Sequence, residues 1–349
     1  MKKRYLIFGG SGSLGTSLIK RLCIDNDVCI YSRDESKHWA LKNKFSGKNI
    51  SFMIGDIRDK DRVAEVISRF KPNVIIIASA LKHVDICELS PEESIKTNII
   101  GPQNIANVVE ENSHLYSKFL ETVLMVSTDK ACAPINVYGM CKAIAERVVL
   151  EKARNVENNN IKFCAVRYGN VLESRGSIIP LFLYQAKNNE CLTVTREDMT
   201  RFLMTLNDSV DLILDCIQNA ENGELYIPKL KSMRIIDLAN IFSKRYNKPV
   251  QIVGIRSGEK IHEAMINETE SLRTIERNNR FVVKPIYDTT IYNQNIFQFD
   301  SSMDVLEINV LEEYLESLGY LSKDLSEFND TTIDVIRKIS QDDIRQMTR

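Results

Sequence analysis

Tyr138 and Lys142 are the residues whose types and spacing most directly suggest catalysis. They are four positions apart in a helical pattern, so they share one helix face. A tyrosine with a reference pKa of about 10 is a poor base at neutral pH, but a neighbouring lysine cation stabilises its phenolate. The pair therefore predicts a base that accepts a proton from a substrate hydroxyl. Taken alone, the same spacing also fits a half-buried tyrosine beside a surface lysine.

A polar segment, Ser127-Thr128-Asp129-Lys130, directly follows an apolar run and precedes Tyr138 by eight residues. In open parallel sheets, ligands bind outside the carboxyl ends of the strands. If the apolar run is a strand, the polar segment lies at that edge, within reach of the Tyr–Lys helix. Thr128, Asp129, Lys130, Tyr138 and Lys142 are therefore our candidate catalytic residues.

A glycine-rich turn follows the first apolar run and opens a helical pattern, with Gly9, Gly12 and Gly15 in the spacing GxxGxxG. Glycine permits a tight turn and lets the backbone approach a pyrophosphate, whose charge is favoured at a helix N-terminus. The strand–turn–helix context favours a dinucleotide site over a plain turn. The residues expected to form this cradle are Gly9, Ser11, Gly12, Ser13, Leu14 and Gly15.

The end of the second expected strand favours NADP over NAD. NAD sites place a carboxylate near this point to hold the ribose 2′-hydroxyl, whereas Ser32 and Arg33 suit a 2′-phosphate. Lys37 lies close enough in sequence to assist, and Asp34 is the residue that would favour NAD instead. Further cofactor contacts are expected from the ends of the third and fourth strands, at Asp56, Ile57, Ala78, Ser79 and Ala80.

Composition limits the possible classes of protein. The chain has 349 residues, with 46 basic and 47 acidic side chains. Near-neutral charge disfavours a nucleic-acid binder, and no apolar run is long enough for a membrane span. The eight cysteines form no CxxC pair and are expected to be reduced core residues of a cytoplasmic protein. No metal-ligand spacing is present, so we expect no metal site.

The elements that position these residues alternate between strands and helices in the first half. This rhythm predicts an α/β fold: a Rossmann-type doubly wound parallel sheet with a second, smaller α/β substrate domain. We assign 1–168 to the NADP-binding domain and 169–349 mainly to the substrate domain, with part of it returning to the first. The strands are expected at Tyr5–Phe8, Val28–Tyr31, Ile50–Ile54, Val74–Ala78, Val123–Val126 and Phe163–Val166. The helical stretches include Leu14–Cys23, Arg62–Phe70, Ser94–Val109, Ile135–Ala153, Ser209–Asn219, Ile235–Tyr246 and Leu311–Leu318.

A series of motifs between residue 5 and about 286 resembles the extended short-chain dehydrogenase/reductase superfamily. Within it, the motifs are most similar to the inverting UDP-N-acetylglucosamine (UDP-GlcNAc) 4,6-dehydratases of pseudaminic-acid and capsule type. They include Ala80-Leu81-Lys82-His83-Val84, Lys96-Thr97-Asn98, Ser127-Thr128-Asp129-Lys130-Ala131, Arg167-Tyr168-Gly169-Asn170-Val171, Ser174-Arg175-Gly176-Ser177, Met199-Thr200-Arg201-Phe202 and Gly258-Glu259-Lys260.

The resemblance implies oxidation at C4 of UDP-GlcNAc by tightly held NADP, loss of water across C5–C6, and return of hydride to C6. Tyr138 would be the base at O4, with Lys142 lowering its pKa. Lys130 would take the C5 proton and a protonated Asp129 would serve the departing 6-hydroxyl. Substrate contacts are expected from Lys82, His83, Asn170, Arg201, Arg256 and Glu259. The resemblance also implies a homo-oligomer and a product with inverted configuration at C5.

Three alternatives remain open from the sequence: a retaining 4,6-dehydratase, a UDP-hexose 4-epimerase, and a non-catalytic NADP-binding protein. The epimerase needs the cradle and the Tyr138–Lys142 pair but not Asp129 and Lys130. The remaining histidines are assigned no chemistry, because His38 and His114 are expected on solvent-facing helix positions and His262 in support of the Glu259 loop.

Overall fold

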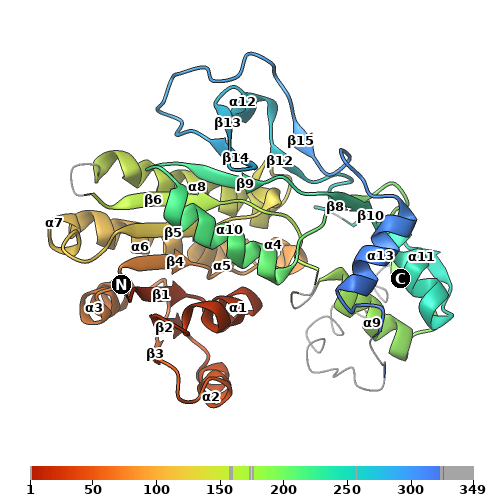
Figure 1. Ribbon diagram of the computed structural model, residues 1–349, viewed down its shortest axis with the longest axis horizontal. Helices are drawn as coiled ribbons and strands as arrows, with labels where there is room; N and C mark the ends of the chain where they lie inside the picture. The colour runs from red at the N-terminus through yellow and green to blue at the C-terminus, as the bar shows by residue number, and fades with distance from the viewer. Residues whose placement is uncertain are drawn as a thin grey trace. The chain divides into compact units, whose positions relative to one another are not determined.

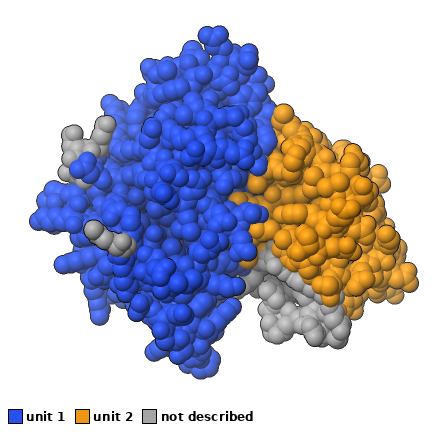
Figure 2. Space-filling model, in the orientation of Figure 1, with its two compact units in different colours: residues 1–169, 207–229, 264–299 blue, residues 170–206, 230–263, 300–349 orange. Residues whose placement is uncertain are grey.

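The computed structural model describes residues 2–156, 160–172, 174, 177–256, 258–322 and 325. It divides into two compact units, coloured separately in Figure 2: residues 1–169, 207–229 and 264–299 form the first, and residues 170–206, 230–263 and 300–349 form the second. The chain thus returns twice to the first unit. Arg175 and Gly176 of one motif, and nearly all of the tail beyond 322, lie outside the described residues.

The first unit is built on a sheet whose described strands have the order β13-β14-β9-β6-β5-β4-β1-β2-β3 (Figure 1). Seven of them are parallel: β1 (Arg4–Phe8), β2 (Asp27–Ser32), β3 (Ile50–Ile54), β4 (Val74–Ile77), β5 (Thr122–Val126), β6 (Lys162–Val166) and β9 (Leu225–Pro228). The hairpin β13 (Thr274–Arg277) and β14 (Arg280–Val283) adds antiparallel to β9. The order 3-2-1-4-5-6 is that of the Rossmann fold, so the predicted fold class is confirmed.

Burial explains why these segments form parallel strands. Every side chain of β4 and β5 is buried, as expected where helices cover both faces of a sheet. Each of the six predicted strands is present, with ends that differ by no more than one residue. A parallel sheet brings the polar residues that follow these strands to one edge.

Helices form a layer on each face of this sheet. Right-handed crossovers place α1 (Ser13–Leu22) and α2 (Glu35–Lys44) on one face, and α3 (Lys60–Phe70), α6 (Gly101–Glu111) and α8 (Val137–Asn155) on the other. An ion pair of 3.0 Å joins Arg21 of α1 to Asp211 of α10 (Leu206–Asn219). Shorter helices are α4 (Val84–Leu89), α5 (Pro91–Ile95), α7 (Ser113–Tyr116) and α12 (Glu268–Ser271). No helix among the described residues is both long enough and apolar enough to cross a bilayer.

The helix predicted over Ser94–Val109 is interrupted, which corrects the sequence-based expectation. A π-helical turn, η1 (Lys96–Ile100), separates α5 from α6. Pro102 cannot donate the backbone hydrogen bond that would continue the α-helix. At Gly101, an added Cβ would lie 2.3 Å from the side chain of Ile57, so α6 passes close to the end of β3. Turns of this kind are frequent at functional sites.

The second unit is a smaller α/β body with its own apolar core. Phe182 and Phe242 pack there with ring centroids 5.8 Å apart. Its elements are α9 (Ile178–Asn188), β7 (Leu192–Val194), β8 (Thr200–Phe202), β10 (Ser232–Arg234), α11 (Ile235–Tyr246), β11 (Val250–Ile252) and α13 (Ile308–Ser317). Strand β10 pairs antiparallel with β8, and β11 pairs parallel with β7. In the first unit, the short strand β12 (Ala264–Ile266) opens the segment 264–299 and pairs with β15 (Phe299–Asp300), which begins at the last residue of that segment.

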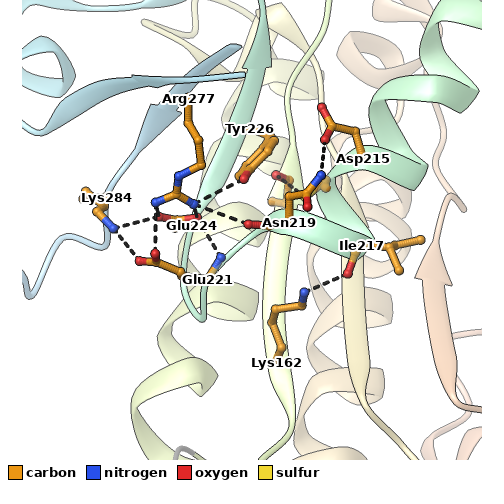
Figure 3. A network of polar contacts seen from close by, with 11 residues as sticks. Lys162, Asp215, Ile217, Asn219, Glu221, Glu224, Tyr226, Arg277 and Lys284 are labelled. Atoms are coloured by element: carbon orange, nitrogen blue, oxygen red, sulfur yellow. Dashed lines mark hydrogen bonds and ion pairs between the residues drawn. The ribbon is translucent and has the colours of Figure 1, made fainter. Parts of the chain in front are cut away.

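A buried carboxylate fastens the β13–β14 hairpin to the sheet (Figure 3). The Glu224 side chain is fully buried just before β9, and it accepts hydrogen bonds from Arg277 of β13 at 2.8 and 3.0 Å. Lys284, just after β14, donates to the same carboxylate at 2.8 Å. Both cations also reach Glu221. The segment 264–299, in which the chain returns to the first unit, is therefore held to the sheet by ion pairs as well as by strand pairing.

We predict that Glu224→Gln lowers the free energy of unfolding by about 3 kcal/mol, because it removes the buried carboxylate and leaves Arg277 and Lys284 with only the exposed Glu221 as an anionic partner among the described residues. Urea unfolding followed by circular dichroism measures the change. The matched control is Glu276→Gln in the same hairpin, which breaks an exposed ion pair with Lys229 and should cost less than ~1 kcal/mol. Equal effects of the two substitutions would contradict the prediction.

Candidate active site

The glycine turn after β1 approaches neighbouring backbone more closely than any other residue type allows. Gly9 has φ +83°, and a Cβ there would lie 2.6 Å from the backbone of Ser79. A Cβ at Gly15 would lie 2.2 Å from the carbonyl oxygen of Gly10. By contrast, a Cβ at Gly12 would be in ordinary contact with its surroundings. The turn is thus packed tightly against β4 and open at Gly12.

The first turn of α1 has the features of an anion site. Its N-cap residue is Gly12, with no side-chain cap and no acidic residue in the first turn. Backbone N–H groups at such an end attract a phosphate. Ser79 and Ser127, which follow β4 and β5, have buried hydroxyl oxygens without a hydrogen-bond partner among the described residues. Such buried oxygens need an explanation, and a polar ligand along this edge supplies one. The cradle therefore fits a dinucleotide.

The predicted ribose and adenine residues lie at the ends of β2 and β3. Arg33 is 56% exposed and 3.6 Å from Asp56, whose carboxylate is already bound by Arg58 at 2.7 Å. These cations hold the pKa of Asp56 below its usual value despite partial burial. Lys37 is 2.6 Å from Asp34, which caps α2. Of the two cations predicted to bind the cofactor, Arg33 is held more loosely than Lys37, because its ion pair is 3.6 Å long and that of Lys37 is 2.6 Å. The carboxylate of Asp34 is occupied by Lys37.

The segment after β5 forms a compact polar turn, η2 (Asp129–Ala131). Asp129 is buried, and its Oδ1 accepts hydrogen bonds from the Thr128 hydroxyl at 2.9 Å and from Lys130 Nζ at 3.2 Å. Lys130 is 18% exposed at its side chain. The carboxyl and the amine are therefore in direct contact in a place that water reaches poorly.

Helix α8 brings Tyr138 to this turn. Asn136 caps the helix by accepting from the backbone N–H of Gly139 at 2.8 Å. A Cβ at Gly139 would lie 2.2 Å from the carbonyl oxygen of Lys130, so only glycine allows this approach. Burial raises the pKa of Tyr138 to about 12, while Lys130 and a hydrogen bond with Thr128 act in the opposite direction. The structure thus brings Thr128, Asp129, Lys130 and Tyr138 together.

Lys142 is placed differently from what we expected. Its amine donates a hydrogen bond of 2.6 Å to the carbonyl oxygen of Val126, and its side chain is buried. Burial lowers the pKa of Lys142 to about 8, with Glu146 opposing the shift. The cation that lowers the pKa of Tyr138 is Lys130 rather than Lys142. The reason is that Lys142 points to the end of β5, whereas Lys130 lies against the start of α8.

A buried ion cluster lies one turn beyond Lys142 on α8, and sequence reasoning missed it. Arg167 follows β6 and binds Glu146, one turn after Lys142 in α8, at 2.6 and 3.1 Å. The same guanidinium binds Glu270 of α12 at 2.9 Å and donates to the carbonyl oxygen of Met265 at 2.7 Å. The spacing of Glu146 four residues after Lys142 was a usable signal. Glu270, the other partner of Arg167, is distant in sequence, so no local pattern indicated it.

The loop after β4 holds the next set of predicted residues. Asn98 of η1, which is fully buried, bonds both the N–H and the carbonyl of Leu81, at 2.8 and 2.9 Å. Lys82 is exposed and His83 is half-buried at the start of α4. Burial, with Lys82 nearby, lowers the pKa of His83. Asn98 therefore fixes the loop, a role that its place in a motif did not reveal.

The remaining predicted substrate residues belong to the second unit. Arg201 donates to the carbonyl oxygens of Thr200 and Ile261 at 2.7 and 3.1 Å. Glu259 accepts a hydrogen bond from the backbone of Arg256 at 3.4 Å, and the Arg256 side chain is exposed. Asn170 has a buried amide oxygen with no partner in the described part of the chain. His262 bonds Thr200 at 2.8 Å. Substrate contact by these residues stays a prediction.

Within the described ranges, no three His, Cys, Asp or Glu side chains are placed to hold a metal ion.

Comparison with known proteins gives consistent matches over most of the chain. The family model described as polysaccharide biosynthesis protein matches residues 5–285. A Campylobacter jejuni protein named UDP-N-acetylglucosamine 4,6-dehydratase (inverting) is 38% identical over 288 residues, covering 81% of this chain and 83% of that protein. A Rickettsia bellii protein named UDP-glucose 4-epimerase is 32% identical over 343 residues, covering 93% and 98%. The X-ray structure of Pen from Bacillus thuringiensis has a TM-score of 0.84 at 29% identity, covering 91% of this chain and 98% of that one.

The low pKa of Lys142 generates a prediction about stability. Between pH 8 and the ordinary lysine value of 10.5, the unfolded chain binds a proton that the folded chain does not, so stability rises with pH through this window. Relative to Lys142→Met, we expect the wild-type chain to lose on the order of 3 kcal/mol as the pH falls from 10.5 to 8. Denaturant titrations of both proteins at several pH values measure this. Parallel stability curves would show that the amine keeps its ordinary pKa.

Proposed function

Because this chain belongs to the polysaccharide biosynthesis protein family, we propose that it is a UDP-GlcNAc 4,6-dehydratase that inverts the configuration at C5. The observation that carries the proposal is the Asp129–Lys130 contact of 3.2 Å beside Tyr138. Oxidation at C4 needs a base such as Tyr138, but it does not need a second acid–base pair. Removal of water across C5–C6 requires a base at C5 and an acid at the 6-hydroxyl, and an amine and a carboxyl in contact supply these two groups.

A nicotinamide dinucleotide bound in the Gly9–Gly15 cradle would accept hydride from C4 and later return it to C6. We propose NADP, held by the first turn of α1 at its diphosphate and by Ser32 and Arg33 at its 2′-phosphate. Lys142 would hold the nicotinamide ribose, in addition to its bond with Val126. Because the hydride returns within one turnover, tight retention favours the reaction.

Tyr138 takes the proton from the 4-hydroxyl as C4 is oxidised. Its pKa of about 12 means that the phenol is mainly protonated in the ligand-free site, so the groups that lower this pKa decide its strength as a base. Lys130 supplies the charge, and Thr128 supplies a hydrogen bond. Thr128 or the buried hydroxyl of Ser127 then positions the substrate oxygen.

Lys130 and Asp129 carry out the elimination. The new C4 ketone acidifies the C5 proton, because the carbanion delocalises into an enolate. When Lys130 passes its proton to Asp129 across their 3.2 Å contact, the product is a neutral amine beside a protonated carboxyl. The amine takes the C5 proton, and the carboxyl donates its proton to the departing 6-hydroxyl, which leaves as water. The pair thus acts as base and acid together.

Inversion at C5 requires that the proton returns to the opposite face of the ring from the one that lost it. The proposal is supported by the similarity to the Campylobacter jejuni protein named as an inverting enzyme. The product is then UDP-2-acetamido-2,6-dideoxy-β-L-arabino-hexos-4-ulose, a precursor for sugars of surface glycans.

The second candidate function is a UDP-hexose 4-epimerase. It is favoured by the similarity to the Rickettsia bellii protein of that name, which extends over nearly the whole chain. It would use the cradle and Tyr138 but leave the Asp129–Lys130 pair without a role in the reaction. The two functions differ in the mass of the product.

We predict that Lys130→Met stops the reaction after oxidation at C4. Reduced nicotinamide, seen by its near-ultraviolet absorption, should accumulate and persist, and turnover should fall by roughly 10²–10⁴. Since Lys130 also lowers the pKa of Tyr138, oxidation in this variant should be slower at neutral pH than in the wild-type chain and should speed up in alkaline buffer, while water loss stays blocked. The control, Tyr138→Phe, should show no reduced cofactor at all. Normal turnover by Lys130→Met would refute its assignment as the base.

We further predict that the purified wild-type chain removes one water from UDP-GlcNAc without added oxidant. In heavy water, one deuterium should enter at C5, and the proton couplings of the product should report the L-arabino configuration. Mass spectrometry and NMR of the product measure both. A product of unchanged mass with the galacto configuration would select the epimerase. Deuterated product with retained C5 configuration would select a retaining dehydratase.

A further inference from the structure

His38 is a buried residue in a place where we expected an exposed one. It lies in the first turns of α2 and is 5% exposed, with its ring packed against Phe52 at a centroid distance of 5.3 Å. Its Nε2 is 2.6 Å from the hydroxyl oxygen of Ser32, the last residue of β2. The expectation of a solvent-facing histidine was wrong because α2 turns this face toward the edge strand β3.

The surroundings of His38 determine which ring nitrogen carries the proton. Its Nδ1 is buried and has no hydrogen-bond partner among the described residues. A buried N–H without an acceptor is rarer in proteins than an acceptor without a donor. Burial also lowers the pKa of His38, although the Asp34 carboxylate opposes the shift, so the ring is neutral at neutral pH and above. The neutral ring therefore carries its proton on Nε2, which donates to Ser32.

This bond determines what Ser32 can offer to a ligand. The Ser32 oxygen accepts from His38, and its own proton has no other hydrogen-bond partner within the described chain. The hydroxyl is therefore available as a donor. A 2′-phosphate presents only acceptors and is charged, so the bond is roughly twice as strong as one to a neutral oxygen. A 2′-hydroxyl is bound best by a carboxylate, but Asp34 is engaged by Lys37 at 2.6 Å.

We propose that His38 is a positioning residue for cofactor specificity: it orients the Ser32 hydroxyl as a donor and so favours a 2′-phosphate over a 2′-hydroxyl. The inference rests on the proposed binding of NADP at this sheet edge. Arg33 supplies charge at the same place, whereas His38 acts through Ser32 and does not itself touch the cofactor. The effect is one of selectivity, and it is separate from catalysis at Tyr138.

The test compares two ligands that differ only in the 2′-phosphate, adenosine 2′,5′-bisphosphate and 5′-AMP. Their affinities are measured by calorimetry on the full chain freed of nucleotide. Mildly alkaline buffer keeps His38 neutral and the phosphate, with its second pKa of about 6, doubly charged. The wild-type chain should prefer the bisphosphate. His38→Leu, which keeps the bulk but removes the nitrogens, should reduce that preference about five- to tenfold while leaving 5′-AMP affinity unchanged.

Two further variants separate positioning from damage to the fold. His38→Gln retains an N–H donor and should restore most of the preference. Ser32→Ala should lose the same factor as His38→Leu, and the double variant should lose no more than either alone. A full preference in His38→Leu would overturn the inference. Equal wild-type affinity for both ligands would refute selection of NADP, and failure to bind either ligand would refute the dinucleotide site itself.

Discussion

The arrangement of the first unit depends most on the buried ion pairs that Arg167 makes. This one guanidinium joins the end of β6 to Glu146 of α8 and to Glu270 of α12, all of them buried. A buried ion cluster of this kind is costly to break, because each group left behind is a charge without a partner. It therefore sets the position of α8 along the sheet, and α8 carries both Tyr138 and Lys142. The returning segment 264–299 is part of the support for the active site.

Burial explains the electrostatics of the candidate catalytic residues. Removing Tyr138 and Lys142 from water moves the pKa of each toward its neutral form, up for the phenol and down for the amine. Lys130 keeps partial contact with solvent and supplies the compensating charge for Tyr138. The two lysines therefore have different roles: Lys130 lowers the pKa of the Tyr138 phenol, and Lys142 is hydrogen-bonded to the carbonyl oxygen of Val126 at the end of β5.

Particular elements show how far sequence reasoning reaches. The strands β1 to β6 were predictable, because short continuous apolar runs that alternate with helical patterns indicate the strands of a parallel sheet. The cradle was predictable as well, since glycine is required where an added Cβ would lie only 2.2–2.6 Å from neighbouring backbone atoms, as at Gly9 and Gly15. The break at η1 was not, because the amphipathic pattern runs unbroken across Pro102 and Gly101. The burial of His38 was not predictable either, because the pattern of α2 does not show which side faces β3.

The sequence by itself determined the order of strands and helices, the glycine turn, and the identity of the residues at the strand ends. These are local properties, set by periodicity and by backbone freedom within a few positions. Only the tertiary structure decided which lysine acts on Tyr138, which carboxylates surround Arg167, and which nitrogen of His38 reaches Ser32. Each of these depends on how closely side chains from separate elements pack and how much water they exclude. Distances between side chains of separate elements are set by tertiary packing, so no local sequence pattern predicts them.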